Sequence, residues 1–180
     1  MNTEYYSHRY ADIILNSDYE LKREIDDVIK SIKYDQICER FEEVNYEKQR
    51  LGNRSSKGKQ SVINCMFREE FLKYNWELEK NVFNDAQNDL IIDFKKRDVG
   101  LDVAFNHRSF IGGDLLRFQA ASEVRNLIKV GVYICPTKAF AKIVSPSDGA
   151  AMVSFERTKW YLQTLYPVIT VPILLIGLTN

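Results

Sequence analysis

The sequence predicts an α/β fold in which a mixed β-sheet is flanked by helices. In the first half of the chain, apolar residues recur at steps of three and four, which is typical of amphipathic helices. From residue 90 onwards, short apolar runs alternate with helical patterns, which favours strands connected by helices. With 180 residues, 45% of them hydrophobic, the chain is long enough to bury one sizeable core, so we expect one domain over residues 1–180.

Two helices and a basic loop are expected in the first half. The first helix runs from Asp18 to Ile32, and Ser17 followed by Glu20 is typical of a cap at its start. The segment from Lys48 to Gln60 has almost no apolar residues, so it predicts a mobile loop rich in cations. The second helix follows this loop and ends near residues 74–75. Its apolar face is formed by Val62, Ile63, Met66, Phe67 and Phe71.

The second half begins with two strands joined by a polar turn, residues 90–94 and 99–105. In the second strand Leu101, Val103 and Phe105 share one face, and Gly100, Asp102 and Ala104 share the other. The elements expected after these strands are a helix at 114–128, a strand at 130–136, a short helix at 138–143, a loop at 145–149, a helix at 154–165 and a strand at 170–178.

Composition alone does not indicate a nucleic-acid partner. The 25 Lys and Arg residues balance 25 Asp and Glu residues, so any such site has to be a local cluster of cations. Cys38, Cys65 and Cys135 are widely spaced in apolar or helical contexts, which predicts reduced structural thiols. The start of the chain lacks a leader pattern and the apolar run at 168–178 is too short to span a bilayer, so we expect a cytoplasmic protein with no membrane partner.

Two aspartates in the predicted strands are candidates for a metal site. Asp93 lies within an apolar strand pattern, and Asp102 lies on the neighbouring strand, where an unpaired carboxylate costs free energy. Mg²⁺ binds one or two carboxylates together with water and substrate phosphate, and can activate a bound water. The alternative is that both aspartates lie on a solvent-facing sheet edge or at hairpin ends. On these two residues alone, that alternative is favoured.

Several segments together resemble one enzyme family. IIDFKKRDVGLDVAFNHRSF is similar to the active-site hairpin of the BglII/BstYI restriction endonucleases, a branch of the PD-(D/E)xK nucleases. YYSHRYADIILN resembles their opening segment, and SVINCMFREEFLKYNW resembles their second helix. VGVYICPTKAF and VPILLIGL resemble their following strands. The resemblance covers most of the chain in the same order, and it implies a restriction-endonuclease-like mixed sheet flanked by helices.

The resemblance implies roles for four residues. Asp93 and Asp102 match the Mg²⁺-binding acidic positions, and Asn64 matches a helix-borne Asn near the active site; its alternative is an ordinary exposed helix residue. Ala104 departs from the pattern, because the family has Gln there and a methyl group can neither bind metal nor orient water. The preferred interpretation is a deliberate substitution. The alternatives are that another group supplies the function, or that the protein binds DNA without cutting it.

DNA contacts are implied in four places. Lys95, Lys96 and Arg97 in the turn are expected to neutralise phosphates beside the metal site. The segment after the second strand and one helical arginine are expected to approach bases or DNA, as is the loop at 145–149. The residues concerned are Asn106, His107, Arg108, Ser109, Arg117, Ser147 and Asp148. In each place the alternative is an ordinary charged turn, helix surface or generic loop.

Three functions follow in order of preference. The first is a homodimeric type II restriction endonuclease that cuts double-stranded DNA at a palindrome, because a two-fold site matches a two-fold protein. The resemblance further implies a GATC-centred site and four-base 5′ overhangs. The second is a sequence-specific DNA-binding protein that does not cut because of Ala104. The third is an α/β interaction domain, which predicts no salt-sensitive affinity for DNA.

Overall fold

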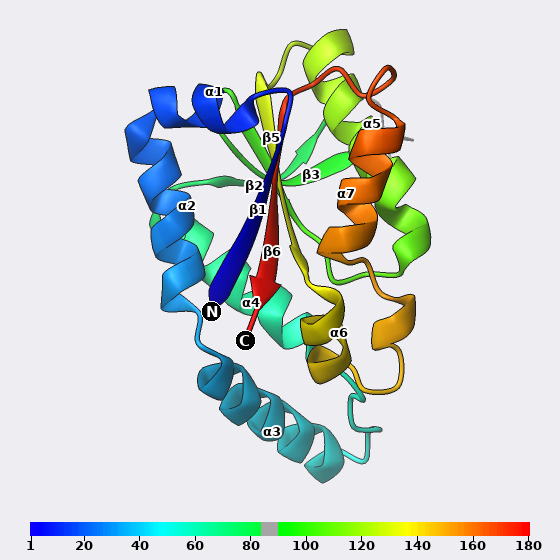
Figure 1. The fold of residues 1–180 in the computed structure, drawn as a ribbon. Coiled ribbons are helices and arrows are strands. Elements are labelled where there is room, and N and C mark those ends of the chain that lie inside the picture. The colour runs from blue at the N-terminus through cyan, green and yellow to red at the C-terminus, as the bar shows by residue number, and fades with distance from the viewer. Residues whose placement is uncertain (84–89) are drawn as a thin grey trace.

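A mixed β-sheet forms the centre of the computed structural model, which describes residues 1–83 and 90–180 (Figure 1). Within these residues the sheet has six strands in the order β1-β6-β5-β4-β3-β2. The strands are β1 (Asn2–His8), β2 (Glu77–Asn81), β3 (Ile91–Lys96), β4 (Val99–Val103), β5 (Val130–Pro136) and β6 (Ile173–Thr179). This arrangement confirms the predicted α/β class and the mixed sheet.

The middle of the sheet is parallel and its margins are antiparallel. β4, β5 and β6 run parallel to one another, whereas β1 is antiparallel to β6, and β2, β3 and β4 form an antiparallel meander. β5 is buried along its whole length, and β6 is buried except at its last residue. Burial on both faces explains why these two strands are almost continuously apolar and carry no alternating polar pattern.

Helices cover both faces of the sheet (Figure 1). One apolar cluster joins α1 (Ala11–Ser17), α2 (Tyr19–Ser31), α4 (Gln60–Lys73) and α6 (Lys138–Val144) to one face. A second cluster joins α5 (Ile111–Gln119) and α7 (Phe155–Thr164) to the other face. Leu101, Val103 and Phe105 belong to the first cluster and Ala104 to the second, so the predicted division of the two faces is confirmed.

The first long predicted helix is α2, which begins at Tyr19, one residue later than a cap at Ser17 predicts. The Asp18 carboxylate accepts a hydrogen bond from the Leu21 N–H at 3.3 Å, so Asp18 caps α2. Ser17 instead donates its hydroxyl to the Ile14 carbonyl at the end of α1. The prediction of Ser17 as the cap was therefore wrong, because α1 occupies the preceding residues and the sequence pattern had not revealed that helix.

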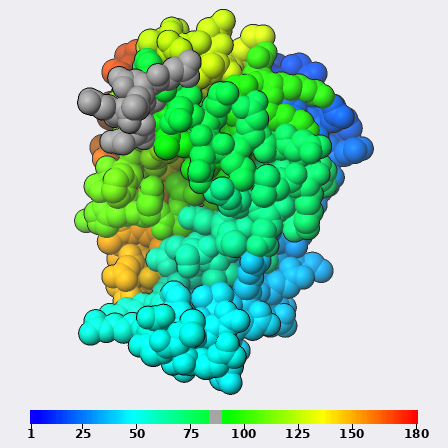
Figure 2. Space-filling model, turned by 180° about the vertical axis from the view of Figure 1, so that it is seen from behind, coloured from blue at the N-terminus to red at the C-terminus, as the bar shows by residue number. Residues whose placement is uncertain are grey.

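The predicted basic loop is shorter than expected. Lys48 and Arg50 form the last turn of α3 (Tyr34–Arg50), and the segment between α3 and α4 spans only residues 51–59. Ile37 is the one fully buried residue of α3, and the helix projects from one end of the molecule together with the following segment, shown in cyan (Figures 1 and 2). The last turn of α3, residues 47–50, contains no apolar side chain, which is why it resembled a loop.

The three cysteines are free thiols with different environments. Cys135 is buried in β5, and Cys38 is half-buried. Cys65 is exposed on α4, so it is not the buried structural thiol that its helical context had suggested. No helix within residues 1–83 and 90–180 has the length and apolar character needed to cross a bilayer.

Candidate active site

Asp93 and Asp102 lie where β3 and β4 separate. The backbone pairing of these strands extends from Lys96–Val99 to Phe94–Leu101. Beyond it, the Asp93 N–H donates to Asp102 Oδ1 at 2.9 Å, and the Val103 N–H donates to Asp93 Oδ2 at 3.0 Å. Each carboxylate therefore accepts a backbone N–H from the opposite strand and replaces a bond of the β-ladder. The structure brings together the two aspartates that the sequence singled out.

Burial makes both carboxylates difficult to ionise. Burial and the nearby charge of Asp93 raise the pKa of Asp102 to about 7, although Arg117 acts in the opposite direction. Burial also raises the pKa of Asp93, partly offset by the hydrogen bond from the Val103 N–H. Two carboxylates that lie close together in a poorly solvated place favour a cation, because a cation relieves both the desolvation and their mutual repulsion.

Arg117 on α5 is the counter-charge that the structure supplies. Its Nη2 donates to Asp102 Oδ2 at 2.7 Å and to Asp114 Oδ1 at 2.9 Å. The Tyr133 hydroxyl donates to the other oxygen of Asp114 at 2.6 Å. The Arg117 side chain is only 18% exposed, which corrects the expectation that it lies on a DNA-facing surface. It is bound within a buried ion network behind the carboxylates.

A cavity of about 250 Å³ opens in front of Asp93. Asn64 from α4 and Asp93 from β3 both line it, so the predicted helix-borne Asn does lie beside the predicted metal ligand. The cavity also contains Arg68 from α4 and Glu79 from β2, which the sequence had not indicated. The full set of lining residues is Asn64, Cys65, Arg68, Glu79, Asp93, Phe94 and Val103. Asp102 does not line the cavity.

The oxygen atoms of this cavity suit Mg²⁺, which keeps water and phosphate among its ligands. They suit less well a metal whose ligands are all protein side chains. Asp93, Glu79 and the amide of Asn64 offer oxygen donors, and Mg²⁺ prefers oxygen and completes its shell with water and substrate phosphate. Among the residues described, no three His, Cys, Asp or Glu side chains gather as a ready metal cluster. Each Asp102 oxygen accepts one hydrogen bond, from the Asp93 N–H and from Arg117, so a metal at Asp102 would share the carboxylate with these donors.

Ala104 occupies the buried continuation of β4. Its N–H donates to the Ile134 carbonyl at 2.8 Å, and its methyl group, 5% exposed, belongs to the apolar cluster under α5 and α7. A methyl group in this cluster supplies no polar atom to Asp93 or Asp102. The structure therefore agrees with the sequence that position 104 supplies no polar group to the candidate site.

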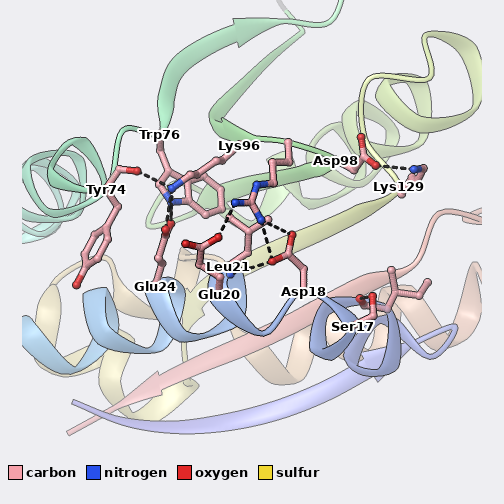
Figure 3. Close-up of polar contacts among 12 residues, drawn as sticks. Ser17, Asp18, Glu20, Leu21, Glu24, Tyr74, Trp76, Lys96, Asp98 and Lys129 are labelled. Atoms are coloured by element: carbon pink, nitrogen blue, oxygen red, sulfur yellow. Dashed lines mark hydrogen bonds and ion pairs between the residues drawn. The ribbon is translucent and has the colours of Figure 1, made fainter.

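The turn between β3 and β4 lies away from the carboxylates. Lys96 donates to Glu24 at 2.7 Å and to the Tyr74 carbonyl at 2.7 Å (Figure 3). Arg97 bonds to Asp18 and Glu20 of α2, and Lys95 donates to the Arg97 carbonyl. For Lys96 and Arg97 the expectation of a place beside the metal site is corrected, because both are ion-paired to residues at the start of α2 and within it. For Lys95, on the same strand as Asp93, it stays a prediction.

The predicted DNA-reading segments meet at the open end of the hairpin. Asn106, His107, Arg108 and Ser109 are exposed and follow directly from β4. A hollow of about 360 Å³ lies between this segment and Asp148 of the 145–149 loop. The Ser147 hydroxyl donates to Asp148 at 2.8 Å. The Lys59 N–H donates to the Val144 carbonyl, so the cation-rich segment 51–59 borders the same end of the molecule.

Comparisons with known proteins agree with this arrangement. The family model described as restriction endonuclease BglII/BglIII matches residues 3–178. The crystal structure of restriction endonuclease BglII complexed with a DNA 16-mer matches with a TM-score of 0.74 and 21% sequence identity. That match covers 100% of this chain and 79% of that chain, and at this identity it shows the fold. Comparison with curated protein sequences gave no significant match.

Proposed function

The chain belongs to the restriction endonuclease BglII/BglIII family, and we propose that it is a type II enzyme that hydrolyses double-stranded DNA at a short palindrome. The observation that carries the proposal is the meeting of Asp93 and Asn64 in one cavity, with the exposed segment 106–109 following directly from β4. Hydrolysis forms a bond from a water oxygen to phosphorus while a bridging phosphorus–oxygen bond breaks. The water loses a proton and the departing oxygen gains one.

We place a Mg²⁺ ion at the Asp93 carboxylate. Bound there, the ion supplies charge stabilisation on the phosphate and lowers the pKa of water. Asp93 holds its position because its Oδ2 accepts the Val103 N–H and its own N–H is fixed by Asp102. Asn64 lies in the same cavity and orients a water or a phosphate oxygen through its amide. Asp102 as a second ligand is a prediction in which its carboxylate binds the ion through an oxygen that also accepts from the Asp93 N–H or Arg117.

Recognition is proposed for the open end of the hairpin. Asn and Arg side chains suit bidentate contacts with base edges, so Asn106 and Arg108 are the preferred base readers. His107 and Asp148 line the same hollow as Asn106, and Ser109 and Ser147, which are close to them in the sequence, are proposed as further contacts. Lys57 and Lys59 are placed to neutralise phosphates. A palindrome centred on GATC and a homodimer, with each subunit cutting one strand, complete the proposal.

The recognition proposal separates two classes of side chain. Replacing Asn106 or Arg108 with alanine should remove about 1–3 kcal/mol of discrimination at one symmetric pair of base positions. Affinities for the cognate duplex and its single-base variants measure this loss. A uniform loss over all duplexes would instead assign these residues to phosphate binding.

Ala104 favours a second candidate function, a DNA-binding protein of the same fold that does not cut. The methyl group cannot orient a water or contact phosphate through a hydrogen bond, and its apolar surroundings offer no substitute. In this case the protein binds its site in the presence of calcium or magnesium and leaves the DNA intact.

Digestion of a plasmid of known sequence distinguishes these functions. The chain as given and its Ala104→Gln variant are incubated with the plasmid and magnesium, and binding to plasmid fragments is measured in calcium. Discrete fragments from either protein support the endonuclease. Specific binding by both proteins without any cutting supports the second function. Absence of DNA binding by both proteins would overturn both proposals.

A further inference from the structure

The cavity in front of Asp93 contains a cation and a second carboxylate that the proposed chemistry has not yet used. Arg68 comes from α4 and Glu79 from β2, and both side chains are about half exposed. Among the described residues that line this cavity, Arg68 alone carries a positive charge. The candidate site therefore has a cation beside Asp93, whereas the residue that follows β4, Ala104, is uncharged.

Arg68 is directed by its place on the helix and by one hydrogen bond. Asn64 and Arg68 are four residues apart on α4, so they project from the same face, and both line the cavity. Arg68 Nη1 donates to Glu79 Oε1 at 2.5 Å. A guanidinium has five N–H groups, and among the hydrogen bonds of the described residues Arg68 uses one. The remaining N–H groups are available to a second anion.

Glu79 is held at the rim of the cavity by the sheet. The β2–β3 pairs on either side of it are Leu78–Phe94 and Lys80–Ile92, which puts Glu79 at the position opposite Asp93. Its φ of 52° lies in the left-handed region, which is uncommon for a residue other than glycine. Backbone strain of this kind tends to occur at functional sites. Glu79 thus brings an acceptor for Arg68 next to the predicted metal ligand.

We propose that Arg68 binds the phosphate group that lies against Asp93, and that Glu79 is a positioning residue that holds the guanidinium over the cavity before DNA arrives. This inference rests on the proposed function and names a further residue of that site. An arginine fork matches two phosphate oxygens and stays charged at any working pH. It neutralises charge on the phosphate where Ala104 contributes no polar group.

Arg68 would have no such role if its bond to Glu79 were only a surface ion pair. Exposed pairs of this kind contribute little to stability, so a stability measurement alone does not separate the two cases. The distinguishing property is a specific energetic coupling between Arg68 and one phosphate of the bound DNA. That coupling is measurable whether or not the protein cuts.

The test uses short duplexes enriched from a randomised pool by binding to the full chain in calcium. Each phosphate of the enriched duplex is then replaced in turn by an uncharged methylphosphonate, and affinity is measured by fluorescence anisotropy. The proteins compared are the chain as given, Arg68→Ala, Arg68→Lys and Glu79→Gln. Lys73→Ala is the matched control, because Lys73 also forms an exposed ion pair on α4 but does not line the cavity.

We expect one phosphate to interact specifically with Arg68. For the chain as given, its replacement should weaken binding by roughly ten- to a hundredfold, the range of one charge-assisted hydrogen bond. In Arg68→Ala that penalty should shrink by about tenfold. Arg68→Lys should retain part of the penalty, and Lys73→Ala should retain all of it. The penalty in Glu79→Gln should lie between these two, because the Arg68 guanidinium is less well held without the Glu79 carboxylate.

Two outcomes would overturn the inference, and they differ from each other. In the first, Arg68→Ala and the unsubstituted chain show identical penalties at every phosphate, and Arg68→Ala melts at the same temperature as Lys73→Ala. This result would remove Arg68 from the site while the proposed function stands. Enrichment of no duplex would overturn the proposed function, and this inference with it.

Discussion

The two ends of the β3–β4 hairpin differ in whether their charged side chains have partners of opposite charge. At the turn, Lys96, Arg97 and Asp98 all bond to side chains of opposite charge on neighbouring elements. At the open end, burial raises the pKa of both Asp93 and Asp102, the charge of Asp93 raises that of Asp102 further, and Arg117 acts in the opposite direction on both. The turn is electrostatically complete without a ligand, whereas the open end is suited to receive a cation. We propose that this difference separates structural charges from functional ones within one hairpin.

The largest effect on the fold should come from the turn. Glu24 is 8% exposed and accepts from both Lys96 and the Trp76 indole N–H. Glu24→Ala removes the counter-charge of the Lys96 ammonium, which keeps only the Tyr74 carbonyl, and leaves the buried Trp76 N–H without its acceptor. Together these losses should lower the free energy of unfolding by about 3–5 kcal/mol. Chemical denaturation measures this loss. Glu20→Ala, which removes an exposed partner of Arg97, is the control and should change stability little. Equal losses in both variants would contradict the division of charges at the turn.

Asp93→Asn should show the opposite behaviour at the open end. Calcium should no longer strengthen DNA binding, a loss of roughly ten- to a hundredfold in the metal-dependent affinity. The fold should not lose stability, because burial already opposes the charge of Asp93. Anisotropy titrations with and without calcium, together with a denaturation curve, measure both quantities. A destabilisation as large as that of Glu24→Ala would make Asp93 a structural residue.

Asp102 should make stability depend on pH in the metal-free protein. Burial and the charge of Asp93 raise the pKa of Asp102 to about 7, above the value of an unfolded Asp of about 4. Between these values the folded state holds a proton that the unfolded state has lost, so stability should fall as pH rises from about 4 to about 7. Melting temperatures across this range measure the slope, and Asp102→Asn should flatten it. A slope unchanged in Asp102→Asn would assign the dependence to other groups.

The smallest effect is expected for Arg97 and DNA. Because Arg97 is bound to Asp18 and Glu20, Arg97→Ala should leave DNA affinity and its salt dependence unchanged. Lys57→Ala, in the segment that borders the open end, should reduce the salt slope by about one phosphate contact. Affinities at two salt concentrations distinguish the variants. A reduced slope in Arg97→Ala would show that DNA also reaches the turn.

The sequence predicted the elements with strong apolar patterns. The strands at residues 130–136 and 170–178 and the helices around 18–32 and 62–74 correspond to β5, β6, α2 and α4. It did not predict β1, β2, α1 or α3, which bury few of their residues. β1 and β2 are margin strands with many exposed residues, and α3 buries only Ile37. Their structure depends on neighbours far along the chain, which a local pattern does not contain.

The candidate site was predicted in part. The apolar surroundings of Asp93 and Asp102 and the family resemblance indicated the carboxylates, and the structure brings them together. Arg117 gave the same signal as any helix-surface cation, so its burial against Asp102 and Asp114 emerged only from the packing of α5. Arg68 and Glu79 gave no signal, because their ion pair joins a helix to a margin strand.

The pairing of β1 with β6 has a consequence for how the chain acquires its fold. Asn2 pairs with Thr179 and His8 pairs with Ile173, so β1 and its sheet neighbour β6 lie far apart along the chain. During synthesis β1 stays without this neighbour until β6 has also been made. Contacts this distant in sequence are slow to form and leave strand edges open to aggregation. We therefore expect β1 to join the sheet later than the local β3–β4 hairpin forms.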